Sequence, residues 1–276
     1  MEMDNNKKLI TIMSDFGWSS QGVGIMKALA SYWCNDAIVV DITHEISSYS
    51  PIDGASELET VYCLPPGGIH VCVVDPGVGT SRKVLLIETE RGDTLIGPDN
   101  GVLLPAARRL GGIRKIIHVI NSPYSPGQVS STFHGRDVMI PAAAAVANGI
   151  EIAKLGNEIL NISELCPAAY EQAQWNDNHF EATVIHINKF GTVYLNISAS
   201  DFVHRKFLPG VITQLKFDDH IIEVPVCLAF GDVPKNAPLI YKDHYERVQI
   251  ALNLSSFTSE YNVALGDRIK IYHNDI

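Results

Sequence analysis

The sequence has few cysteines and no excess of positive charge. Five cysteines are spread over 276 residues, and no two of them form a Cys-x-x-Cys pair. An odd, widely spaced set argues against a disulfide framework and against a cysteine zinc site. Acidic residues outnumber basic ones by 31 to 21, which gives a formal net charge of −10. Because nucleic-acid-binding proteins usually present a basic face, no nucleic-acid partner is expected.

Long apolar runs are also missing. The polar start at 1–8 is followed by an apolar run that is only as long as a strand. No segment has the length or flanks of a signal peptide or a membrane span. We therefore expect no membrane partner and a cytoplasmic location. Hydrophobic residues still make up 46% of the chain, enough for a sizeable core in one large domain or two moderate ones.

Short apolar runs alternate with helical patterns up to about residue 150. The pattern predicts strands at 9–13, 37–42, 69–74, 84–88, 94–96 and 116–120, and helices at 22–33, from 51, at 102–110 and after 137. Apolar strands separated by helices predict an α/β domain with a mostly parallel central sheet. Ligand loops in such sheets lie beyond the carboxyl ends of the strands, which is where Asp15 and Asp75 are expected.

The pattern changes in the last third of the chain. After a mixed, polar stretch at 156–178, apolar residues alternate with a period of two in five segments: 179–187, 193–197, 212–217, 221–226 and 268–272. Such short alternating strands are typical of an antiparallel β-barrel. The sequence therefore predicts an N-terminal α/β domain at 1–165, a linker at 166–178 and a smaller C-terminal β-barrel domain at 179–276.

Three polar segments of the N-terminal half are candidates for chemistry. Asp15, in Ser-Asp-Phe-Gly, offers two acceptors for a ribose diol or a metal, or simply forms a turn. The segment 75–82 has glycines that let a ligand approach the backbone, framed by Asp75 and Arg82, but it is neither a P-loop nor GxGxxG. His134 lies in a loop entering a helix. Together Asp75, Arg82 and His134 can orient a water and stabilise hydroxide without metal.

Two alternatives remain open at this point. A metal-dependent phosphatase or nucleotidase would use hard ligands, for which the candidates are Asp15, His44, Asp75, Asp99 and His134. The nearby Arg82 and the lack of HxH or DxD spacing argue against it. The second alternative is a nucleoside-binding protein with little or no turnover.

Taken in order, the motifs resemble those of the S-adenosyl-L-methionine (SAM) hydroxide adenosyltransferase family, which is related to SAM-dependent fluorinases and chlorinases. The resemblance rests on Ser14–Gly17, Asp75–Thr80, Arg82, Pro98–Gly101 and Phe133–Asp137. It implies an N-terminal α/β domain, a C-terminal β-barrel and a homotrimer. In that trimer, active sites lie between one subunit's N-terminal domain and a neighbour's C-terminal domain.

The implied reaction is hydrolysis of SAM to adenosine and L-methionine by in-line attack of an activated water on C5′. SAM is then the substrate, with no metal and no cofactor. The resemblance assigns the catalytic role to Asp75, Arg82 and His134. It assigns substrate binding to eight further residues: Asp15, Phe16, Tyr49, Phe133, Gly135, Asn188, Phe190 and Asn253.

Two departures from related patterns carry information. Where the halogenases have Tyr-Ser at their halide site, this chain has His134-Gly135, and Asp75 replaces a halogenase tyrosine. A carboxylate there would repel halide, so hydroxide is the expected nucleophile. In the C-terminal half, Asn188 stands where the family has an aspartate that helps to hold the methionine ammonium.

Overall fold

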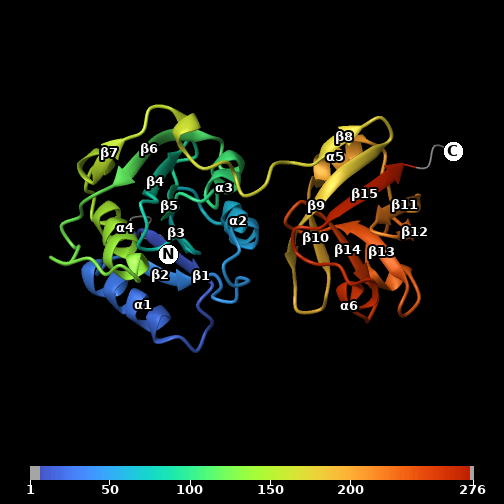
Figure 1. Ribbon diagram of the computed structural model, residues 1–276, viewed down its shortest axis with the longest axis horizontal. Coiled ribbons are helices and arrows are strands. Elements are labelled where there is room, and N and C mark those ends of the chain that lie inside the picture. Colours follow the sequence, from blue (N-terminus) through green and yellow to red (C-terminus); the bar gives the residue numbers. More distant parts are fainter. Residues whose placement is uncertain (1–6, 274–276) are drawn as a thin grey trace, which may run out of the picture. The chain divides into compact units, whose positions relative to one another are not determined.

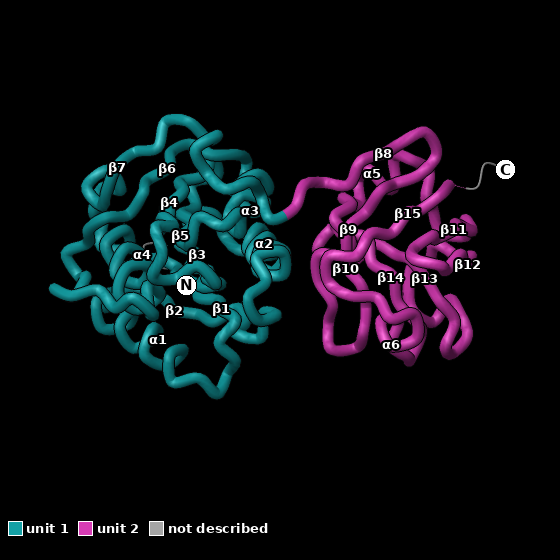
Figure 2. The backbone as a smooth tube through the Cα atoms, in the orientation of Figure 1, with its two compact units in different colours: residues 1–169 teal, residues 170–276 magenta. Residues whose placement is uncertain are grey.

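The computed structural model describes residues 7–273, which form two compact units. Unit 1 comprises Met1–Ala169 and unit 2 comprises Tyr170–Ile276 (Figure 2). The domain limits expected from the sequence stay predictions, although a short strand, β8 (Gln174–Asn176), lies inside the expected linker. Within the described part of the chain, no helix combines the length and the hydropathy needed to span a bilayer.

Unit 1 is built on a seven-stranded sheet with the order β2-β1-β3-β5-β4-β6-β7 (Figure 1). The strands are β1 (Leu9–Ser14), β2 (Ile38–Asp41), β3 (Ile69–Val73), β4 (Val84–Thr89), β5 (Thr94–Pro98), β6 (Ile113–Val119) and β7 (Gly156–Glu158). The α-helices are α1 (Gln21–Trp33), α2 (Pro51–Glu59), α3 (Leu104–Arg109) and α4 (Ile140–Ala147). Four short helices complete the unit: η1 (Thr60–Cys63), η2 (Gly135–Met139), η3 (Ile152–Lys154) and η4 (Ile162–Glu164).

The sheet is mixed, and not mostly parallel as the sequence pattern predicted. Strands β2, β1, β3 and β5 pair in parallel, but β4 is antiparallel to both β5 and β6, and β6 is antiparallel to β7. The reason is the short turn at 90–93 between β4 and β5, where Thr89 N donates to Asp93 O. A parallel return needs a crossover of a dozen residues or more, so four residues can only reverse the chain.

Helices cover both faces of this sheet, and their ends follow local sequence rules. α1 and α4 pack together on one face, and α2 and α3 lie against the other (Figure 1). As expected, Ser50 caps α2 by accepting from Asp53 N, with Pro51 in the first turn. The expected start just before Pro141 is confirmed for α4, but the π-turn η2 runs directly into it.

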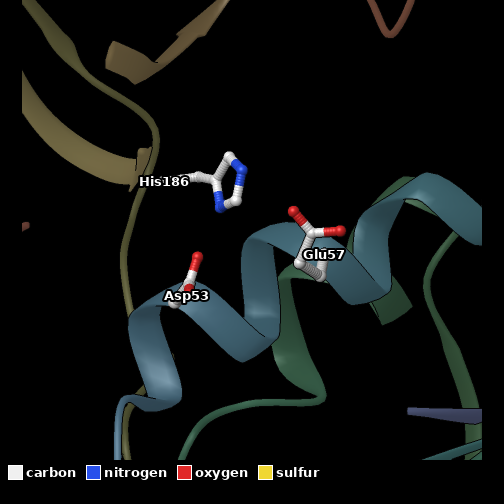
Figure 3. Close-up of side chains that lie close together, drawn as sticks. All are labelled: Asp53, Glu57 and His186. Carbon is white, nitrogen blue, oxygen red and sulfur yellow. The ribbon is translucent and has the colours of Figure 1, made fainter. Parts of the chain in front are cut away.

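Two acidic side chains stand one turn apart on α2, as Figure 3 shows for Asp53 and Glu57. Asp53 lies in the first helical turn, where the helix dipole favours a negative charge, and accepts from Ser47 N at 2.7 Å. This contact ties the helix start to the loop that precedes it. The third residue labelled there, His186, belongs to β9 of unit 2, where its ring meets Tyr194 edge-on.

A buried polar network links three parallel strands near their amino ends. His70 on β3 is fully buried, with Nδ1 2.8 Å from Thr11 Oγ1 on β1 and Nε2 3.3 Å from Asp93 Oδ1 just before β5. Arg91 donates to both oxygens of Asp93 and to the carbonyl of Tyr62. Burial alone would raise the pKa of Asp93, but the hydrogen bonds from His70 and Arg91 outweigh it and lower the pKa to about 2.

Acid should therefore weaken unit 1 over a defined range. A carboxyl whose pKa falls from 3.8 to about 2 on folding stabilises the fold above pH 3.8 and loses that contribution as the pH drops toward 2. The contribution is roughly 2 kcal/mol. We expect Asp93→Asn to lower the free energy of unfolding at neutral pH and to flatten its dependence on pH between 4 and 2. Denaturant unfolding at a series of pH values, with the exposed Asp36→Asn as control, measures this; a wild-type-like pH dependence in Asp93→Asn would contradict it.

Unit 2 is an antiparallel, barrel-like sheet of eight strands. They are β8, β9 (His179–Ile187), β10 (Val193–Ser198), β11 (Ile212–Phe217), β12 (His220–Pro225), β13 (Pro238–Lys242), β14 (Arg247–Leu252) and β15 (Arg268–His273). The order β12-β11-β15-β9-β10-β14-β13 nearly closes, since a bridge between Val226 and Ile240 joins the two ends. Two helices, α5 (Ala199–His204) and α6 (Phe257–Tyr261), and the short η5 (Phe230–Asp232) complete it. The smaller barrel predicted from the alternating pattern is thus present in outline.

Candidate active site

A cavity of about 280 Å³ lies where the carboxyl ends of β1, β2 and β3 meet. This volume is slightly below the usual range for small-molecule sites, roughly 300–1,000 Å³. The loops that follow the three strands and the loop entering η2 all contribute to its wall. The cavity is lined by Asp15, Phe16, Ser48, Tyr49, Val73, Asp75, Val78, Thr132, Phe133, His134 and Gly135.

The loop after β1 presents Asp15 to this cavity. Its Oδ2 accepts from the backbone N of Tyr49 at 2.9 Å, so the loops after β1 and β2 are joined at the cavity wall. Tyr49 has a positive φ of 62°, which an L-residue adopts rarely, and its side chain is exposed. Phe16 meets Phe133 edge-on, with the ring centroids 5.7 Å apart. The Asp15 carboxylate and three aromatic rings therefore share one cavity.

Asp75, Arg82 and His134 are brought together although 52 residues separate the last two. Arg82 Nε donates to Asp75 Oδ1 at 2.7 Å and Nη2 donates to Oδ2, which makes a two-point contact. The same Nη2 lies 2.8 Å from His134 Nδ1. The side chains of Arg82 and Asp75 are only 10% and 7% exposed, so this contact is shielded from water. Asp75 and His134 line the cavity, whereas Arg82 is not among the lining residues.

The contact with Arg82 decides where His134 carries its proton. A guanidinium only donates hydrogen bonds, so Nδ1 of His134 has to accept and the proton of the neutral ring lies on Nε2. Burial first, and then the charge of Arg82, lower the pKa of His134 below its ordinary 6.5, against the opposing charges of Asp75 and Asp137. His134 is therefore a neutral imidazole at pH 7.

Two glycines let the loops approach closely enough to form this arrangement. A Cβ on Gly135 would lie 2.8 Å from Val73 Cγ1 and 3.1 Å from the sulfur of Met26, too close for a side chain. Gly79 has a φ of +79°, and its Cβ would lie 2.3 Å from the carbonyl oxygen of Ser131. The backbone at Gly135, where η2 begins, therefore packs against the side chains of Val73 and Met26. The backbone at Gly79, in the loop after β3, packs against the backbone of Ser131.

Charged residues further along η2 hold the His134 loop. Asp137 is buried, pairs with Arg136 through Nε at 2.6 Å, and accepts from Ser130 N at 2.8 Å. The guanidinium of Arg136 lies 5.3 Å from the centre of the Phe133 ring. These contacts fix the loop at 130–134 at both ends.

Other candidates from the sequence have structural places. Asp99 accepts from Cys166 N at 3.0 Å, and Asn100 donates to Val74 O at 2.9 Å, so the turn after β5 anchors the end of β3 rather than the cavity. His44 is fully buried and faces Ser14 and Asp41. Within the described residues of unit 1, no three histidine, cysteine or acidic side chains bring ligand atoms within 4.8 Å of one another. The five hard-ligand candidates do not form a metal site there.

Unit 2 has a cavity of its own, of about 900 Å³, and all three residues expected from the C-terminal half line it. Asn188 Oδ1 accepts from the backbone N of Phe190 and of Thr192, so it shapes the loop between β9 and β10. Asn253 donates to Val233 O at 2.8 Å. Aromatic and amide side chains make up much of the remaining wall, among them Tyr194, Phe230, Tyr241 and Gln249.

Several lining residues were not singled out from the sequence. Ser48 and Thr132 lie beside expected residues, so adjacency was the available signal. In unit 2, Asp243 is buried, accepts from Tyr245 N and Arg247 N, and receives Gln249 Nε2. Its place in the cavity depends on the pairing of β13 with β14, two strands that the sequence pattern did not predict.

Comparison with known proteins finds relatives of both units. A family model described as the SAM hydroxide adenosyltransferase N-terminal domain matches residues 10–156, and one for the C-terminal domain matches residues 182–270. A protein named (R)-S-adenosyl-L-methionine hydrolase from Methanocaldococcus jannaschii is 34% identical over 81% of this chain and 80% of its own length. One of the same name from Salinispora tropica is 30% identical over 95% and 97%. A solved structure of an uncharacterized conserved protein from Thermotoga maritima matches with a TM-score of 0.88 at 28% identity, covering 96% of this chain and 100% of that one.

Proposed function

This chain belongs to the S-adenosyl-L-methionine hydroxide adenosyltransferase family, and on that premise we propose that it hydrolyses SAM to adenosine and L-methionine. The observation that carries the proposal is the contact of Arg82 with both Asp75 and His134 at the wall of a cavity that also holds Asp15. Because the relatives are named for the (R)-sulfonium epimer, we propose that epimer as the substrate.

The contacts favour a different role for each of the three residues around the attacking water. His134 Nε2–H is a donor, so it holds the water oxygen, while the Asp75 carboxylate is an acceptor and takes a water proton. Arg82 holds the Asp75 carboxylate in place through two hydrogen bonds and fixes the His134 tautomer. The water oxygen then bonds to C5′ as the C5′–S bond breaks and its electron pair passes to sulfur. The products are adenosine, neutral methionine thioether and one proton.

Positioning supplies much of the acceleration in such a reaction. The sulfonium is already a good leaving group, so the site has to align the nucleophile with the C5′–S bond and limit its hydration. We assign Asp15 to the ribose hydroxyls, and Phe16, Tyr49 and Phe133 to the nucleoside, with Gly135 leaving room beside His134. The negative charge of Asp75 beside the nucleophile repels a halide ion and so disfavours halide as the nucleophile. No metal or other cofactor takes part in this proposal.

Product analysis in labelled water tests the reaction. Each sulfonium epimer is incubated with the protein in H₂¹⁸O with EDTA and with sodium chloride. The expected result is methionine plus adenosine labelled at the 5′ oxygen, from the (R) epimer, with no 5′-halogenated nucleoside. Adenosine formed only after a divalent metal is added, or no adenosine from either epimer, would overturn the hydrolase assignment.

We further propose that the protein is a cytoplasmic homotrimer whose substrate site uses unit 1 of one subunit and unit 2 of a neighbour. In support, some residues assigned to the substrate line the cavity of unit 1 and others line that of unit 2, and all five cysteines are free. Light scattering should give three times 30.2 kDa. Co-expression of Arg82→Ala with Phe190→Ala should restore activity that neither variant has alone; a monomer, or no restoration, would contradict the shared site.

The low pKa of His134 sets the acid limit of activity. Protonation places a hydrogen on Nδ1 against the donating Arg82, so activity should be present above the His134 pKa and fall as the pH drops through it. Because burial and Arg82 lower this pKa, the midpoint of the acid limb should lie below 6.5. The pH profile of kcat/KM and an NMR titration of the His134 ring measure it. A midpoint at or above 6.5 in both would contradict the assigned hydrogen bond.

A further inference from the structure

Next to the Asp15 loop, a row of polar side chains at one edge of the sheet leads from the buried Ser14 and His44 to the partly exposed Lys27. Ser14 Oγ, at the end of β1, lies 2.7 Å from Nδ1 of His44, and both residues are fully buried. Nε2 of His44 faces Asp41 Oδ1 at 3.3 Å, at the end of β2. The other oxygen of Asp41 accepts from Lys27 Nζ on α1 at 2.5 Å. The four residues lie in a row, with hydrogen bonds between Ser14 and His44 and between Asp41 and Lys27.

Nε2 of His44 and Oδ1 of Asp41 lie 3.3 Å apart, but neither atom has a hydrogen-bond partner among the described residues. The negative charge of Asp41 still favours the tautomer with the proton on Nε2. Nδ1 is then the acceptor for the Ser14 hydroxyl, whose own lone pairs accept from Phe16 N at 3.3 Å. The row therefore ends on the backbone that carries Asp15.

The same histidine holds this loop by its backbone as well. Its carbonyl accepts from Gly17 N at 2.7 Å, and the carbonyl of Thr43 accepts from Ser14 N at 3.1 Å. The Trp18 ring meets the His44 ring edge-on at 4.9 Å. Ser14 and Gly17, on either side of Asp15, are thereby hydrogen-bonded to His44 or to its neighbour Thr43.

A nucleophilic role for Ser14 does not fit these contacts. Serine, histidine and aspartate in a row can activate a hydroxyl for acyl transfer, but that requires the hydroxyl to reach a substrate. Ser14 is fully buried and does not line the cavity, whereas its neighbour Asp15 does. The contacts are those of a support for the loop.

We propose that His44 is a positioning residue that, through Ser14, aims the Asp15 carboxylate at the ribose hydroxyls. The proposal rests on the proposed function, because it takes Asp15 as the group that binds the ribose. It makes a prediction that a general structural role does not make: loss of His44 should weaken recognition of the ribose hydroxyls alone.

Binding of two nucleosides separates these roles. Calorimetry measures the Kd of adenosine and of 2′,3′-dideoxyadenosine, which lacks the hydroxyls, for wild-type protein, His44→Leu, His44→Asn, Ser14→Ala and Asp15→Asn. Wild-type protein should prefer adenosine by roughly tenfold or more, as hydrogen bonds to a charged group allow. His44→Leu should lose most of this preference and keep its affinity for the dideoxy compound. His44→Asn, which keeps a polar atom near Ser14, should retain more of it.

The outcomes are distinguishable. An adenosine preference unchanged in both His44→Leu and Ser14→Ala overturns the proposal, as does an equal loss of affinity for both ligands. If His44→Leu does not fold, Ser14→Ala removes the same hydrogen bond with a smaller change and decides the question. A preference that survives Asp15→Asn instead overturns the assignment of Asp15 in the proposed function, and the role of His44 falls with it.

Discussion

Replacement of His134 by alanine should lower kcat by roughly 10²–10⁴-fold, the range for loss of a group that handles a proton or stabilises an anion. The ring holds the water through Nε2–H in our proposal, and no other imidazole lines the cavity among the described residues. The affinity for adenosine should change little, since Asp15 and the aromatic rings remain. Steady-state kinetics and calorimetry on the same preparations separate the two quantities.

The matched control is His204→Ala, an exposed histidine in the last turn of α5. It should leave kcat within twofold of wild type. If His134→Ala retained near-wild-type turnover while folding normally, His134 would not be part of the water site. An equal loss in both variants would point to a general effect on the fold.

Replacement of Arg82 by alanine should cause a loss in kcat of similar size, roughly 10²–10⁴-fold. It would remove the two-point contact with Asp75 and the donor to His134, and leave a poorly exposed carboxylate without its cation. Arg82→Lys should recover little, because an ammonium cannot reproduce the planar fork that serves both neighbours at once. This failure of a charge-conserving change is the more informative result.

Arg114→Ala is the control for loss of an arginine in the same unit. Its side chain is 47% exposed, and its guanidinium faces Glu88 and Glu90 at 3.5 and 3.6 Å, surface contacts that contribute little to stability. Turnover should be unchanged there. Full activity in Arg82→Lys would show that only the charge matters and would refute the geometric role given to Arg82.

Local sequence rules predicted much of the fold because they act over a few residues. The cap at Ser50, the proline at the start of α4 and the apolar runs of β1 and β3 each needed only near neighbours. The direction of β4 was missed because it depends on the length of one turn. β14 was not foreseen since Arg247 and Gln249, polar by type, are both buried within it.

The candidate site was predictable in its parts but not in its contacts. Strand ends located Asp15 and Asp75, and the motif order suggested that His134 belongs with them. The sequence could not show that Arg82 binds Asp75 at two points while reaching His134, because that depends on a backbone approach at Gly79. The neighbours of His44 were likewise not predictable, because the pairing of β1 with β2 sets Ser14 and Asp41 on either side of it.

The polar cluster of Thr11, His70 and Asp93 joins strands near their amino ends, and the loops of the candidate active site follow the opposite ends of β1 and β3. Acid should therefore affect activity and stability in two separate pH ranges. In mild acid His134 gains a proton, whereas Asp93, with a pKa of about 2, remains ionised. The protein should therefore lose activity while it remains folded. Return to neutral pH should then restore turnover at once, without refolding.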